Sequence, residues 1–155
     1  MENKGGREFI WIASVVVVLA IFLGSIAYAL RLRYSVASEV SVMPLEKATG
    51  LFQPEVKDLG DGRYQVDIIA FQWGFRPARV ELNNPREIIL RIYSNDVIHG
   101  IQIVGTNVNV MVIPGYIATV IWRPPQNING TLLVICNEYC GIGHSGMYME
   151  IVMKR

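Results

Sequence analysis

The sequence predicts an all-β domain, either a β-sandwich or a Greek-key barrel, attached to one N-terminal transmembrane helix. Three observations predict this fold class. Residues 9–30 form a long run without charges, eight short segments rich in β-branched and aromatic residues follow residue 62, and no long helical pattern appears beyond that point. The 155 residues provide for one ordinary domain in addition to the helix.

Composition excludes several classes of protein. The chain has 14 Lys and Arg residues against 13 Asp and Glu residues, with a formal net charge of +1, so we expect no nucleic-acid partner. Hydrophobic residues make up 52% of the chain and charged residues 17%, which excludes disorder as the dominant state. Two cysteines and two histidines exclude a disulfide-rich scaffold and any metal site with three histidine ligands.

The uncharged run 9–30 predicts a transmembrane anchor. At ~1.5 Å per residue, a helix of this length covers about 33 Å, enough for a hydrocarbon core of about 30 Å. Trp11 and Tyr28 lie near its ends, where interfacial aromatic residues are common. Residues 27–29 resemble a cleavage site, but the apolar region of a signal peptide is shorter, at about 7–15 residues. Two basic residues lie on each side of the run, so the charges do not give its orientation.

The pattern changes at residue 62. Residues 31–62 contain prolines, glycines and the turn signal Gly60-Asp61-Gly62, which predicts a linker or membrane-proximal segment, with a short helix or a collar over 38–47. Residues 63–155 are predicted to be the β domain, because short β-rich runs there are separated by Gly, Pro and Asn. The predicted strands are 64–71, 78–82, 87–93, 97–104, 107–113, 116–122, 131–136 and 148–153.

Both cysteines fall in one loop after the strand predicted at 131–136. Cys136, Cys140, His144 and Met147 lie close together in the sequence, with three glycines among them. The other histidine, His99, belongs to an earlier predicted strand. Thiolate, thioether and imidazole form a donor set that copper prefers, and one Cys, two His and a weak axial Met define the mononuclear blue-copper site.

The second cysteine favours a site for two copper ions. Two thiolates can each bridge both ions, which gives each copper two sulfurs and one imidazole and leaves two weak axial positions. Met147 suits one of these positions, and the backbone carbonyl of Glu138, between the cysteines, suits the other. Shared thiolates leave little to rearrange on oxidation, as electron transfer requires.

Three simpler interpretations remain at this point. A disulfide between Cys136 and Cys140 would close a tight loop and leave the nearby His144 without a role. A single tetrahedral zinc ion accepts two Cys and two His ligands, although it gives Met147 no function. The histidines and the methionine could each be an ordinary core residue, but this interpretation does not explain why they occur together with both cysteines. A pair of copper ions fits the whole set best.

The loop resembles the CuA signature of the cytochrome c oxidase subunit II family. The matching residues are Cys136-x-Glu138-x-Cys140-Gly141-x-Gly143-His144-x-x-Met147, with Asp96-Val97-Ile98-His99 upstream, and Gln72-Trp73 and Ile113-Pro114-Gly115 lie where the family places such residues. The resemblance implies a cupredoxin-like fold and a dinuclear copper centre. The ligands that it implies are His99, Cys136, the Glu138 carbonyl, Cys140, His144 and Met147.

The resemblance also implies where the protein lies and what it contacts. Residues 1–8 would be a cytoplasmic N-terminus, and the domain 63–155 would lie on the periplasmic side of the plasma membrane. The single helix resembles the B-type haem–copper oxidases, in which a small single-helix subunit can occupy the place of a second helix. Subunit I with its haem and copper, cytochrome c as electron donor, and the lipid membrane complete the implied partners.

Two residues have further implied roles. The family resemblance makes Trp73 the residue that accepts electrons from cytochrome c, although a core position is the usual place for a tryptophan. In many relatives the carboxylate that matches Glu138 helps to hold Mg²⁺ or Mn²⁺ at the boundary with subunit I, and oxygen ligands suit such ions. B-type relatives can lack this second metal site, so the resemblance leaves it open.

The predicted function is electron uptake into a terminal oxidase. The chain would accept electrons from cytochrome c and pass them to subunit I, where oxygen reduction and proton translocation occur. It would be a subunit of an enzyme without carrying the oxygen chemistry. Three alternatives fit less well: nitrous oxide reductase needs a large second domain, membrane-anchored copper chaperones need a βαβ body, and the quinol-oxidase form of subunit II lacks the copper ligands.

Overall fold

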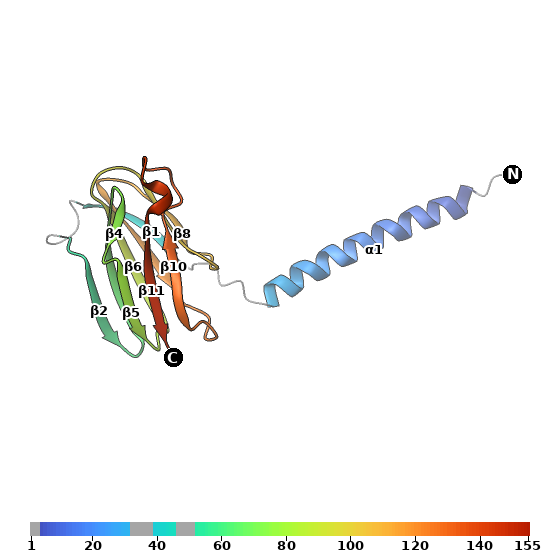
Figure 1. The fold of residues 1–155 in the computed structure, drawn as a ribbon. Coiled ribbons are helices and arrows are strands. Elements are labelled where there is room, and N and C mark those ends of the chain that lie inside the picture. The colour runs from blue at the N-terminus through green and yellow to red at the C-terminus, as the bar shows by residue number, and fades with distance from the viewer. Residues whose placement is uncertain (1–3, 32–38, 46–51) are drawn as a thin grey trace. The chain divides into compact units, whose positions relative to one another are not determined.

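The computed structural model describes residues 4–31, 39–45 and 52–155 and divides the chain into two units, Met1–Tyr34 and Ser35–Arg155. The first unit contains helix α1 (Lys4–Arg31) (Figure 1). Its segment Gly6–Arg31 is long and apolar enough to cross a membrane, and its large apolar side chains are exposed. In lipid a lone segment satisfies its backbone polar groups only as a helix. The predicted apolar helix is therefore confirmed, and its insertion into a membrane stays a prediction.

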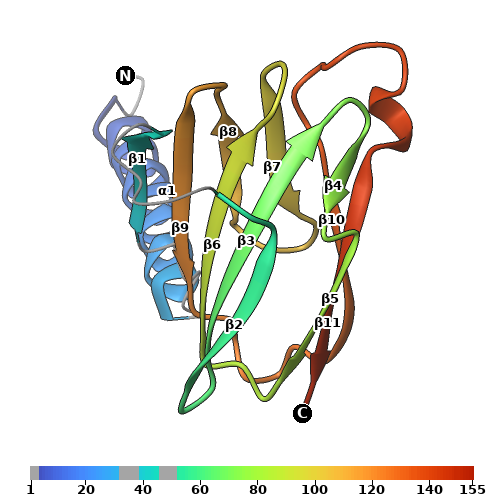
Figure 2. The ribbon, with the colours of Figure 1, turned by 90° about the vertical axis from the view of Figure 1, so that its left-hand side faces the viewer.

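The second unit is a sandwich of two β-sheets (Figure 2). In the first sheet the strand order is β1-β9-β6-β3-β2, with β4 paired to β3, and in the second it is β5-β11-β10-β7-β8. Most neighbours are antiparallel, but β3 with β6 and β5 with β11 are parallel. The strands are β1 (Glu39–Pro44), β2 (Glu55–Gly60), β3 (Arg63–Phe71), β4 (Gly74–Arg76), β5 (Arg79–Asn83), β6 (Glu87–Ser94), β7 (His99–Ile103), β8 (Asn109–Val112), β9 (Tyr116–Trp122), β10 (Gly130–Ile135) and β11 (Tyr148–Lys154).

The core lies between the two sheets. In β6 every second residue is buried, and Ile88, Leu90 and Ile92 are fully inaccessible to solvent. This follows from the strand geometry, because successive side chains point to opposite faces. Burial of each such aliphatic side chain contributes about 1.5–3 kcal/mol to folding. The all-β sandwich predicted from the sequence is confirmed.

All eight predicted strands are present, but the linker prediction is wrong over two segments. β1 pairs with β9, and β2 pairs with β3, so strands inside the range 31–62 belong to the sheet. β1 also occupies most of the range 38–47, where a short helix or a collar was expected, and residues 46–51 lie outside the described part. The prediction missed these strands because they are edge strands with mainly exposed side chains, without the buried alternation that marks a central strand.

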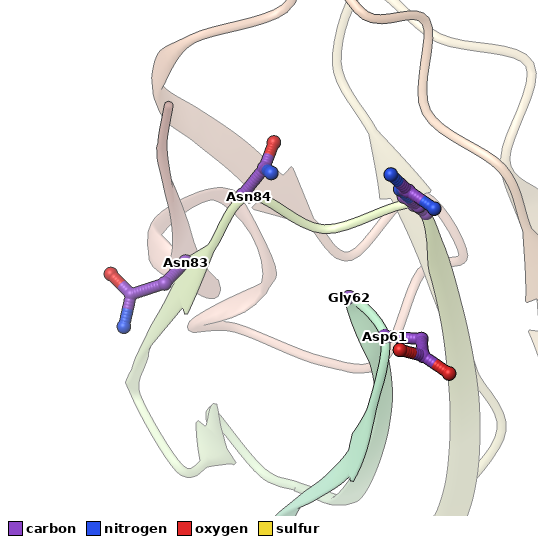
Figure 3. A pocket seen from close by; sticks show the side chains of 5 residues that line it. Asp61, Gly62, Asn83 and Asn84 are labelled. Carbon is purple, nitrogen blue, oxygen red and sulfur yellow. The ribbon is translucent and has the colours of Figure 1, made fainter.

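Two tight turns meet at one end of the sandwich. The β2–β3 turn and the β5–β6 turn border a polar hollow of about 260 Å³, lined by Asp61, Gly62, Asn83, Asn84 and Arg86 (Figure 3). The nitrogen of Arg86 donates a hydrogen bond to the carbonyl of Gly62 at 2.7 Å. Gly62 has φ +73°, and a Cβ there would lie 2.7 Å from the Asn84 carbonyl oxygen. Only glycine allows the two turns to approach so closely.

Candidate metal centre

Residues 136–147, here called the metal loop, connect β10 to β11 at the opposite end of the sandwich (Figure 2). A hydrogen bond of 3.1 Å from the nitrogen of Cys136 to the carbonyl of Met147 closes the base of this loop. The loop also contains a short 3-10 helix, η2 (His144–Gly146). β7 starts at His99 and lies beside β10, after which the metal loop begins. The second sheet therefore sets the position of His99 relative to the loop.

The two cysteines lie side by side as free, buried thiols. Their sulfur atoms are 3.8 Å apart, whereas a disulfide requires about 2.05 Å. The Cys136 sulfur lies 3.8 Å from Nδ1 of His99, and the Cys140 sulfur lies 3.6 Å from Nδ1 of His144. Each sulfur therefore has one imidazole nitrogen beside it. The disulfide interpretation is not what the structure shows.

Two weaker donors complete the cluster. The Met147 sulfur lies 3.7 Å from the Cys140 sulfur, and the Glu138 carbonyl oxygen lies 3.2 Å from the Cys136 sulfur. Met147 is buried to 2% exposure, so its thioether faces the cluster and not solvent. All six donor groups that the sequence singled out are therefore brought together. Their role as metal ligands stays a prediction.

Asp96 orients the upstream histidine, which sequence reasoning did not anticipate. Its Oδ1 lies 2.8 Å from Nε2 of His99, so Nε2 carries the proton and Nδ1 is left to face Cys136. Burial alone would raise the pKa of Asp96, but the backbone N–H of Gln72, the His99 ring and the backbone N–H of Val97 donate hydrogen bonds to it. Together these hold the pKa below its usual value. An Asp three residues before a His was the available signal.

Burial also affects the thiols. It raises the pKa of the Cys140 thiol to about 11, and the neighbouring Cys136 thiol adds to the shift. The thiol is therefore protonated at neutral pH when no metal is bound. Since a metal binds the thiolate, loading the site must release this proton.

Trp73 lies against the metal loop from the β3–β4 turn. Its Nε1 donates a hydrogen bond of 3.2 Å to the Cys140 carbonyl, and Nε2 of Gln72 donates to the same oxygen at 2.6 Å. A Cβ on Gly143 would lie 2.5 Å from the indole, so the loop admits the ring only because residue 143 is glycine. Trp73 is 45% exposed, which shows that it is not a core residue.

The donor chemistry tests which metal fits. Two thiols, two imidazoles and one thioether are the soft and intermediate ligands that copper prefers. A single zinc ion would use two sulfurs and two nitrogens but would give no role to the Met147 thioether or to the Glu138 carbonyl. The residues present therefore fit copper better than one zinc ion.

The part of the chain that the structure describes offers no cluster of side chains for a second, hard-ion site at Glu138. Within the described residues, the one group of three or more His, Cys, Asp or Glu side chains with the spacing of a metal site is His99, Cys136 and Cys140. The Glu138 carboxylate belongs to no such group. Mg²⁺ or Mn²⁺ at Glu138 would need further oxygen ligands beside that carboxylate.

The fold and the cluster define a class, a cupredoxin-like domain with a copper-type donor set at one end of the sandwich. The family model for the periplasmic domain of cytochrome c oxidase subunit II matches residues 71–155. A curated relative, cytochrome c oxidase subunit 2 of Thermus thermophilus, is 34% identical over 152 residues, which cover 93% of this chain and 89% of the relative. The chain therefore belongs to the cytochrome c oxidase subunit II family, whose members bind copper. It is a subunit of a haem–copper terminal oxidase, an oxidoreductase complex.

Other comparisons agree. A second Thermus thermophilus cytochrome c oxidase subunit 2 is 42% identical over 99 residues, covering 64% of this chain and 72% of the relative. A chain from the cryo-EM structure of a haem–copper terminal oxidase dimer is 28% identical with a TM-score of 0.64, covering 96% of this chain and 99% of that one. The periplasmic domain of subunit II of cytochrome oxidase from Bradyrhizobium japonicum is 18% identical, with a TM-score of 0.50 and coverage of 60% and 83%. It shows the shared fold.

Proposed function

We propose that this chain is the electron-accepting subunit of a cytochrome c oxidase, with a dinuclear copper centre that takes electrons from cytochrome c. The observation that carries the proposal is the pairing of the two cysteines. Two unlinked thiols lie 3.8 Å apart, and each has its own imidazole nitrogen and its own weak donor within 3.8 Å. One metal ion does not need this duplicated arrangement, and two ions do.

The chain's own residues have distinct tasks in this proposal. Cys136 and Cys140 would hold the copper ions jointly, His99 and His144 would each bind one, and Met147 and the Glu138 carbonyl would occupy the weak positions. Bound copper supplies one-electron oxidation and reduction at this place. The sandwich keeps water away from the sulfurs, since the two cysteines are only 5% and 4% exposed. Asp96 holds the proton of His99 on Nε2, which keeps Nδ1 available as a ligand.

Trp73 supplies the docking surface in this proposal. Its indole is partly exposed and hydrogen-bonded to the Cys140 carbonyl, so a short path runs from the protein surface to a thiolate ligand. Ile142 and Tyr139 of the metal loop are 92% and 79% exposed and add apolar surface. An exposed apolar area around an aromatic residue is typical of a protein–protein contact. Cytochrome c would place its haem edge there.

The proposal also covers the surroundings of the chain. Helix α1 would anchor it in the plasma membrane by a single pass, with residues 9–30 in the lipid, 1–8 on the cytoplasmic side and the domain on the periplasmic side. Subunit I would receive the electron and would carry out oxygen reduction with proton translocation. A small single-helix subunit would stand in for a second anchor helix, and Mg²⁺ or Mn²⁺ at Glu138 would depend on subunit I ligands.

The decisive experiment measures metal content and EPR spectra of the full chain in detergent after copper loading. We expect two copper ions per chain and a signal from one unpaired electron shared by both. One copper ion with a signal localised on a single nucleus would contradict the dinuclear site. If the chain takes up one zinc ion in preference to copper from a mixture of both metals, the result would support a single zinc site instead.

A further inference from the structure

Beside Glu138, the metal loop is packed unusually closely onto β7. Gly100 is the second residue of β7, and a Cβ at this position would lie 2.0 Å from Oδ1 of Asn137 and 2.9 Å from the backbone nitrogen of Glu138. Normal contacts between such atoms are about 3.5 Å or longer. The bare backbone of Gly100 is therefore what allows residues 137 and 138 to lie where they do.

Asn137 is held from a second direction by β8. Its Nδ2 donates a hydrogen bond of 2.9 Å to Oδ1 of Asn109. Asn109 is opposite Gln102 in the β7–β8 ladder, two residues from Gly100, so Asn109 and Gly100 share one face of the sheet. The Asn137 side chain therefore spans two neighbouring strands.

Hydrogen bonding of the Asn137 oxygen does not explain this placement. Oδ1 is buried and has no hydrogen-bond partner among the described residues. An unsatisfied buried acceptor is unfavourable, so the oxygen does not fix the amide, which is oriented by its Nδ2 hydrogen bond and by its fit to Gly100. The close packing on Gly100 therefore restrains the backbone nitrogen of Glu138, while the Cys136 sulfur lies 3.2 Å from its carbonyl oxygen.

We propose that Asn137, held between Asn109 and Gly100, is a positioning residue that aims the Glu138 carbonyl at the metal cluster and thereby tunes the reduction potential. This inference rests on the proposed copper function. The nitrogen and the carbonyl of Glu138 belong to one residue, so a displaced nitrogen redirects the carbonyl. That oxygen is 3.2 Å from the Cys136 sulfur, the place of a weak donor. A weak donor shifts the potential more than it changes the binding of copper.

The test uses the full chain in detergent, loaded with copper, and the variants Asn109→Leu, Asn137→Ala and Gly100→Ala. Each should retain two copper ions, with a changed EPR hyperfine pattern and a shifted potential. We expect up to a tenfold change in the relative stability of the two oxidation states, which corresponds to about 59 mV for one electron. The double variant Asn109→Leu/Asn137→Ala should shift the potential no further than Asn137→Ala alone, because Asn109 acts only through the Asn137 side chain. Asn83→Ala, at the far end of the sandwich, is the matched control.

A second measurement needs no metal. In the metal-free chain, amide hydrogen exchange at Glu138 should be faster in the three variants than in the unmodified protein or in Asn83→Ala.

Variants with two copper ions and an unchanged potential and spectrum would overturn the inference. Loss of copper, with an unchanged spectrum in the molecules that still hold it, would also overturn the inference, because Asn137 would then only stabilise the fold. If the unmodified chain does not bind two copper ions, the proposed function fails and the tuning role fails with it. Faster exchange would then support the restraint on Glu138 alone, and unchanged exchange would contradict that restraint as well.

Discussion

The two ends of the β-sandwich connect their strands by similar means but differ in what they bury. At the end with the polar hollow, the lining side chains Asp61, Asn83, Asn84 and Arg86 are exposed, and the turns touch through backbone atoms. At the metal-loop end, thiol and imidazole groups far apart in the sequence, such as Cys136 and His99, are buried and face one another.

A glycine that permits close approach occurs at both ends, so close approach alone does not mark a functional site. Gly62 allows two turns to meet, as Gly143 allows the Trp73 indole to lie on the metal loop. The two ends differ because only the metal-loop end buries polar groups that contact one another. Burying such groups costs desolvation free energy, which a merely structural turn avoids. This burial therefore indicates a functional site at the metal-loop end.

The largest effect is expected from removing either sulfur. Cys136→Ser and Cys140→Ser should each abolish the two-copper EPR signal, because one remaining thiolate cannot bridge two ions symmetrically. Cys136→Ser is the sharper test, since it leaves the donor set of a mononuclear blue-copper site. An intact two-copper spectrum in either variant would contradict the dinuclear model.

Replacing the exposed indole should impair electron uptake while leaving the copper in place. Trp73→Ala is expected to weaken docking of cytochrome c by about 2 kcal/mol, as removal of a central interface tryptophan does. Stopped-flow reduction by cytochrome c, beside copper analysis and thermal melting, measures this. Unchanged uptake by a stable variant would remove Trp73 from the electron path, and loss of copper together with the fold would make it a structural residue.

A smaller effect is expected at the weak sulfur donor. Met147→Leu should keep both copper ions and shift the reduction potential by tens of millivolts, where about 59 mV corresponds to a tenfold change in relative stability of the two oxidation states. Redox titration followed by absorbance gives the value. Complete loss of copper, as in the cysteine variants, would show that the thioether is a strong ligand and that the assumed order of donor strengths is wrong.

The far end should respond in stability alone. Gly62→Ala is expected to lower the free energy of unfolding by about 1–3 kcal/mol, because alanine is strained at φ +73° and its Cβ would contact the Asn84 carbonyl. Copper content and EPR spectrum should not change. Asn83→Ala, an exposed side chain at the same hollow, should change stability by no more than about 0.5 kcal/mol. A changed spectrum in either variant would show that the two ends are coupled.

Much of this protein could be predicted from its sequence because the signals are local. The uncharged run 9–30 predicts a helix, since a lone apolar segment can satisfy its backbone in no other way in lipid. Alternation in segments such as β6 predicts central strands. The spacing of Cys136, Cys140, His144 and Met147 predicts a shared metal cluster, because all four lie on one connection.

Other features were decided only by the tertiary structure. β1 and β2 are strands because β9 and β3 offer unpaired edges to them, a condition set by distant parts of the chain. The Trp73 indole lies on the metal loop because Gly143, 70 positions later, leaves room for the ring there. Asp96 can orient His99 because the backbone N–H of Gln72, from the distant β3–β4 turn, holds its carboxylate in place. The orientation of Glu138 by Asn137, in our proposal, depends on contacts with β7 and β8. Local patterns specify which groups are available, whereas packing decides which of them meet and which are buried.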